Sequence, residues 1–109
     1  MHFLLLVAIH FILLSGYSEI LKIPGNELIK AFGSKVDFAF IDSGDAKCRR
    51  EEIELLLTSM RPGGMIALHD VAPQHADCRN IYNMIDNLGI PVEKIYFNTP
   101  RGLALFLKK

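Results

Sequence analysis

Residues 36–71 read VDFAFIDSGDAKCRREEIELLLTSMRPGGMIALHDV, and this stretch decides the fold. It contains two apolar runs, Val36–Asp42 and Met65–Asp70, and each run ends in a carboxylate. The segment between them has apolar residues at helical spacing: Ile53, Leu56, Leu57 and Met60. Two strands that are joined by one helix are expected to be parallel, because so long a crossover suits a βαβ unit. The stretch therefore predicts an α/β domain.

Parallel strands end at the same edge of a sheet, and open α/β sheets bind their ligands at that edge. Asp42 and Asp70 are both expected there. If the two strands are neighbours, the carboxylates lie roughly 5 to 8 Å apart, which is one strand spacing plus side-chain reach. The pair is therefore a candidate functional site, although Asp42 alone would also suit a structural hydrogen bond to the loop that follows it.

The N-terminal third is less clearly patterned. Phe3–Leu14 is a dozen residues with only His10 polar, which is too short for a membrane-spanning helix of about 20 residues. We expect a buried strand or core segment; a signal or membrane-associated segment and a mis-set start are the alternatives. Tyr17–Lys22 is expected to form a helical turn and Glu27–Phe32 a short helix.

The segments after residue 42 carry clearer signals. Asp45 is expected to cap a helix that reaches Met60, and Asp77 to cap a second helix that reaches Leu88. Two strands close the chain, and so short a connection predicts an antiparallel hairpin of Val92–Phe97 and Leu103–Leu107. The charged residues of the first helix are expected on its solvent face: Arg49, Arg50, Glu52 and Glu54.

The composition limits the function classes. A chain of 109 residues predicts one domain, 1–109, and its net charge of zero argues against a nucleic-acid partner. Two cysteines, Cys48 and Cys78, are too few for a disulfide scaffold and fit no zinc motif. This usage suits a reducing cytoplasm, with a redox or ligand role for the thiols as the alternative. No membrane partner is expected.

Four motifs occur in order: IDS at 41–43, PGG at 62–64, HD at 69–70 and TPRG at 99–102. From about Phe11 to its C-terminus the chain resembles the second half of a class I S-adenosylmethionine-dependent methyltransferase of the small-molecule O-methyltransferase type. The resemblance implies a partial Rossmann-like sheet of parallel strands with helices on its faces. It also implies that the last strand is antiparallel, in agreement with the expected hairpin.

The resemblance also implies a chemistry, namely methyl transfer from S-adenosylmethionine to a small hydroxylated substrate. In metal-dependent relatives, strand-end carboxylates bind Mg²⁺ or another divalent metal, and Asp42 and Asp70 match two such ligands. His69 and Asp70 are the expected catalytic residues, with His69 as the general base that takes the proton of the substrate hydroxyl.

The chain departs from the family at the cofactor. Nothing in it matches the Gly-rich loop or the ribose-binding acidic residue, so the residues that bind the cofactor are unknown. We expect a truncated domain with an apolar N-terminal segment, 1–14. The alternative function is a non-catalytic fragment that uses an exposed sheet edge to form a homo-oligomer or to complement another chain.

Overall fold

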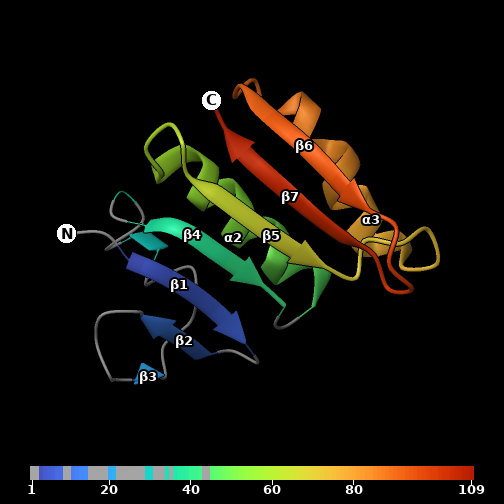
Figure 1. Cartoon of the computed structure of the whole chain (residues 1–109), viewed down its shortest axis with the longest axis horizontal. Helices are drawn as coiled ribbons and strands as arrows, with labels where there is room; N and C mark the ends of the chain where they lie inside the picture. The colour runs from blue at the N-terminus through green and yellow to red at the C-terminus, as the bar shows by residue number, and fades with distance from the viewer. Residues whose placement is uncertain are drawn as a thin grey trace.

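The computed structural model describes residues 3–8, 11–14, 20–21, 29–30, 34, 36–42 and 45–109. Seven strands form one mixed sheet in the order β3-β2-β1-β4-β5-β7-β6 (Figure 1). The strands are β1 (Phe3–Ala8), β2 (Phe11–Leu14), β3 (Ile20–Leu21), β4 (Val36–Ile41), β5 (Met65–His69), β6 (Val92–Phe97) and β7 (Leu103–Lys108). The helices are α2 (Ala46–Ser59), α3 (Ala76–Met84) and the 3₁₀ turn η2 (Ile85–Asn87).

The predicted βαβ unit is confirmed. β4 and β5 are parallel neighbours with α2 as their crossover, so both strands end at the same edge of the sheet. β6 and β7 form the predicted antiparallel hairpin, and β7 lies antiparallel to β5. The last strand is therefore inserted between β5 and β6, as the family resemblance implies.

The N-terminal prediction is partly wrong. The segment Phe3–Leu14 contains two strands, β1 and β2, which pair antiparallel, since strands so close in the chain cannot be joined by a parallel crossover. β3 also pairs antiparallel, so the parallel part of the sheet is limited to β1, β4 and β5. Ile20–Leu21 is extended rather than a helical turn, because its backbone pairs with β2.

The short helix predicted over Glu27–Phe32 is only partly described. Residues 29 and 30 are helical, and the other four positions lie outside the described residues. The same holds for His10. Ile29 is fully buried in the core.

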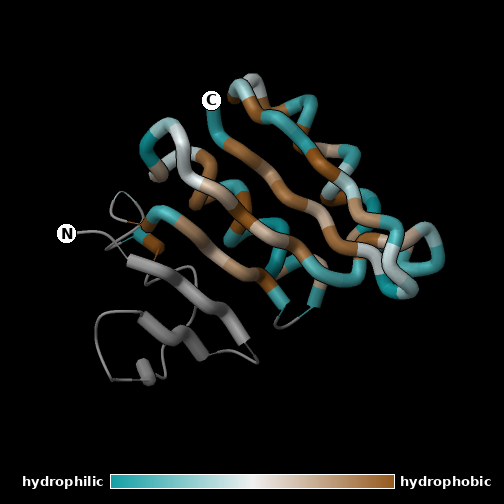
Figure 2. The backbone as a smooth tube through the Cα atoms, in the orientation of Figure 1, coloured by the Kyte–Doolittle hydropathy of each residue, from teal (hydrophilic) through white to brown (hydrophobic). Residues whose placement is uncertain are grey.

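The core lies between the helices and one face of the sheet. In the described part of the chain, α2 and α3 both lie on this face, whereas helices on both faces were expected (Figure 1). Strand alternation builds the core, because paired residues share a face. The buried row consists of Ala39, Ile41, Ile66, Leu68, Ala104 and Phe106. Figure 2 shows the hydrophobic character of β5 and β7.

Helix α2 buries two charged residues that were predicted to face solvent. Arg49 is 8% exposed and Glu52 is 6% exposed. The reason is their spacing, because positions 49, 52, 53, 56 and 57 form one helical stripe, and all five are buried. The prediction treated charge as a sign of exposure and overlooked this helical spacing.

The start of α2 follows the prediction. The Asp45 carboxylate accepts a hydrogen bond of 2.8 Å from the backbone N–H of Cys48, as an N-cap does. Replacing Asp45 with alanine is expected to lower the free energy of unfolding by about 1 kcal/mol, because one helix N–H loses its acceptor. Urea denaturation measures the loss. Thr58→Ala, at an exposed position of the same helix, is the control, and an equal effect of both substitutions would contradict a capping role.

Helix α3 starts two residues earlier than predicted. His75 occupies the N-cap position without a side-chain hydrogen bond, and Asp77 lies in the first turn rather than at the cap. The helix ends at Met84 and continues as η2, so the predicted end near Leu88 is reached through a 3₁₀ turn. In the part of the chain that the structure describes, no helix has the length and apolar character needed to cross a membrane.

Candidate functional site

Three predicted site residues meet at the carboxyl ends of β4 and β5. Asp42 follows β4, His69 is the last residue of β5, and Asp70 follows it. One side-chain ligand atom from each lies within 4.8 Å of the others. The two carboxylates therefore lie close together, as predicted, and slightly closer than the predicted range. We call these three residues the strand-end cluster.

The backbone of Asp70 is unusual. Its φ angle is 65°, in the left-handed region that non-glycine residues seldom adopt, although aspartate tolerates it better than most. Its N–H donates to the carbonyl of Gly102 at 3.0 Å, so the turn before β7 holds this conformation. Such conformations persist where the surrounding structure fixes them, and they are frequent at functional sites.

His69 faces both carboxylates through one ring nitrogen. Its Nδ1 lies 3.2 Å from Asp42 Oδ1 and 3.3 Å from Asp70 Oδ1. Carboxylates only accept hydrogen bonds, so Nδ1 must carry the hydrogen. In the neutral ring Nε2 is then the acceptor, and no hydrogen bond to Nε2 is found among the described residues. The cluster thus fixes the tautomer that leaves Nε2 able to take a proton.

Arg49 closes the cluster from the helix side. Its guanidinium lies 3.7 Å from Asp42 and 3.5 Å from Asp70, and its side chain is only 10% exposed. It also donates to the carbonyl of His69 at 3.2 Å and to Cys78 Sγ at 3.5 Å. Sequence reasoning missed this residue, although the helical stripe described above was the signal that places it inward.

Arg101 binds the cluster from the other side. Its Nε donates to Asp70 Oδ1 at 2.6 Å, and the side chain is 61% exposed. Sequence reasoning placed it in the hairpin turn and assigned it no role. The signal that could have located Arg101 is its position next to Gly102 in the TPRG motif. The turn that contains this motif is hydrogen-bonded to residues 70–72.

The charges around Asp70 change its acidity. Burial alone would raise the pKa of its carboxyl group. The hydrogen bond from Arg101, together with the nearby His69 and Arg49, outweighs burial and holds the pKa of Asp70 below its ordinary value. Asp70 is therefore an ionised acceptor at neutral pH and not a proton donor.

The two thiols are poor candidates for redox or ligand chemistry. Burial is the main reason that the pKa of Cys78 is raised, and the hydrogen bond to Asp45 is the main reason that the pKa of Cys48 is raised. The reactive form of cysteine is the thiolate, so a raised pKa disfavours its reactions. Cys78 acts here as an acceptor for Arg49.

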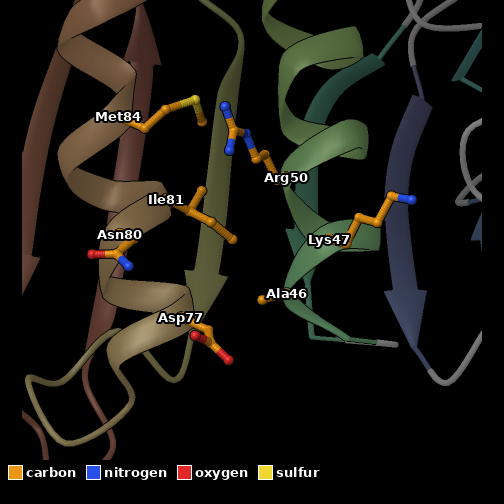
Figure 3. A pocket seen from close by; sticks show the side chains of 7 residues that line it. All are labelled: Ala46, Lys47, Arg50, Asp77, Asn80, Ile81 and Met84. Carbon is orange, nitrogen blue, oxygen red and sulfur yellow. The ribbon is translucent and has the colours of Figure 1, made fainter.

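A hollow of about 540 Å³ lies beside the cluster. Its lining includes Arg49 and Asp70 together with the first residues of α3, so a small molecule bound there would meet Asp70, one of the three residues of the strand-end cluster. A second hollow, of about 370 Å³, separates α2 from α3 and touches no cluster residue. Figure 3 shows Arg50 reaching toward α3 and Ile81 reaching toward α2 across it.

The family usually holds the methionine part of S-adenosylmethionine in a Gly-rich loop. The described residues form no such loop. The described glycines are Gly63, Gly64, Gly89 and Gly102. The first three do not adjoin the strand-end cluster, and Gly102 packs so closely on Ala72 that nothing fits between them. We therefore assign no cofactor contact to these residues.

The chain matches a known protein family. Residues 8–71 match a family described as a methyltransferase domain, and the match covers more than half of the chain. It ends one residue after Asp70, so it includes the whole strand-end cluster but not α3, β6 or β7. No curated protein matches the chain. The chain belongs to the family of methyltransferase domains.

Proposed function

We propose that the chain is part of a class I S-adenosylmethionine-dependent methyltransferase whose methyl acceptor is a hydroxyl group of a small molecule. The part that it carries is the one that activates this hydroxyl group. His69 is the general base. One observation supports this assignment above all, namely that both carboxylates lie at Nδ1, so Nε2 is the nitrogen left to accept a proton.

The proton path follows from this tautomer. As the substrate oxygen becomes a nucleophile, its hydrogen moves to Nε2 and His69 becomes an imidazolium. Asp42 and Asp70 hold the ring in place and stabilise its positive charge, as the aspartate of a Ser-His-Asp triad does. General-base catalysis of this kind contributes about 10²- to 10⁴-fold in rate.

No step of this proposal passes through a metal ion. Asp42 and Asp70 were predicted as ligands of Mg²⁺ or another divalent metal, and that prediction remains untested. Both carboxylates already have arginine and histidine partners in the structure, so the proposed chemistry uses them to orient His69.

The test uses the full chain with isotope-labelled S-adenosylmethionine and a panel of small phenols and sugars. We expect labelled methyl ether products from the wild type. His69→Gln is expected to lower the rate by at least about 100-fold, because glutamine cannot take the proton. His69→Ala is expected to regain part of the rate when imidazole is added.

Glu54→Gln, on the outer side of α2, is the control and should leave the rate unchanged. A rate of His69→Gln close to that of the wild type would contradict the role of His69. Absence of any labelled product across the panel would contradict methyl transfer by this chain.

A further inference from the structure

We propose that Arg49 occupies the place of a divalent cation at the strand-end cluster, so that the site is built to work without a metal. Within metal-dependent relatives, a cation at this edge would offset the clustered negative charge. In this chain a guanidinium group from α2 lies between the two carboxylates and does the same.

The carboxylate oxygens that a cation would need are already in use. Asp42 Oδ1 faces His69 and Arg49, Asp70 Oδ1 accepts from Arg101, and Asp70 Oδ2 faces Arg49. Three of the four carboxylate oxygens therefore have a partner. Imidazole is also a poor ligand for Mg²⁺, and His69 Nδ1 would have to give up its hydrogen to bind any metal.

The charges also oppose a cation. Two arginines cancel the two carboxylates, so with neutral His69 the cluster and the two arginines together have no net charge. Metal affinity of oxygen sites rises with the number of ligand charges. An incoming divalent ion would meet no attraction and would approach a guanidinium group at close range.

Arg49, rather than Arg101, is the group that a metal cannot easily displace. Arg101 is largely exposed and can turn into solvent. Arg49 is nearly buried and is also held by the His69 carbonyl and by Cys78 Sγ. Moving it would leave two partly buried acceptors without their donor, which carries a free-energy cost.

The experiment measures Mn²⁺ binding to the full chain by the electron paramagnetic resonance signal of free Mn²⁺, and it involves no methyl transfer. We expect the wild type to bind with a dissociation constant weaker than about 1 mM. Arg49→Gln is expected to bind at least about tenfold more tightly, because it leaves the carboxylates with one guanidinium group instead of two. Adding Asp42→Asn to this variant should abolish the gain.

Arg49→Lys is the matched control. It keeps the positive charge, so it should bind Mn²⁺ as weakly as the wild type. An equal gain in Arg49→Lys and Arg49→Gln would overturn the proposal, because loosening of the site would then explain both. Failure of Arg49→Gln to gain affinity would also overturn it.

If circular dichroism shows that Arg49→Gln does not fold, the wild-type chain still tests the proposal. Binding of Mn²⁺ by the wild type at micromolar concentration, lost in Asp42→Asn, would overturn the proposal directly. Equal and weak binding by the wild type and Asp42→Asn supports it. Because methylation is not measured, this inference can fail or hold whatever the outcome for His69.

Discussion

Replacing Gly102 with alanine is expected to lower the free energy of unfolding by about 3 kcal/mol or more. A Cβ at this position would overlap the backbone nitrogen of Ala72, and the φ angle of +81° also disfavours any residue with a side chain. Backbone atoms cannot turn aside as side chains do, so the turn and residues 70–72 must separate. Urea denaturation followed by circular dichroism measures the loss.

Gly89→Ala is the control for this prediction. Gly89 also has a positive φ angle, +72°, but a Cβ there would meet nothing within 4 Å. Gly89→Ala should therefore lower the free energy of unfolding only through backbone strain, by about 1 kcal/mol. If both substitutions destabilise the protein equally, the close approach at Gly102 is not what holds the turn in place.

The position of Gly102 also explains how the C-terminal hairpin contributes to the site. The carbonyl of Gly102 accepts the N–H groups of Asp70 and Val71, and that of Arg101 accepts the N–H of Ala72. The same turn brings the Arg101 side chain to Asp70. The hairpin lies outside the matched family segment, yet it fixes the conformation of a residue within it.

The central part of the fold was predictable from local pattern. Two apolar runs around an amphipathic segment specify a βαβ unit, and the parallel geometry brings the ends of the strands together without further information. Asp42, His69 and Asp70 therefore could be located as a group. The tight hairpin of β6 and β7 was equally local.

Other features depend on information that no local pattern carries. No glycine, proline, asparagine or aspartate marks a turn between Phe3 and Leu14, so the division into β1 and β2 had no sequence signal. Arg101 is 31 residues from its partner Asp70, and only the tertiary arrangement brings the two together. The arginines that neutralise the site were the main omission.

Glu52 leads to the second large prediction, which concerns pH. Burial is the main cause that raises the pKa of its carboxyl group to about 7, only partly offset by the charge of Arg49. Its Oε2 has no hydrogen-bond partner among the described residues. The folded state therefore favours the protonated form, whereas the unfolded chain ionises near the ordinary value of 4.5.

The direction in which stability changes with pH follows from this difference in pKa. Below the ordinary pKa both states are protonated, and the folded state has no penalty from Glu52. As the pH rises from 4.5 through 7, the unfolded chain ionises first and stability falls, by about 3 kcal/mol in total. Glu52→Gln cannot ionise, so we expect it to be more stable than the wild type by about 3 kcal/mol above neutral pH and nearly equal to it in acid.

Urea denaturation of both proteins at a series of pH values measures this difference. Glu51→Gln, at the preceding and exposed position, is the matched control and should change the free energy of unfolding by less than about 0.5 kcal/mol at every pH. A constant difference between Glu52→Gln and the wild type at all pH values would show that packing, and not ionisation, separates them. A loss of stability in Glu52→Gln that grows above neutral pH would mean that the ionised carboxylate is stabilised by Arg49 more than it is opposed by burial.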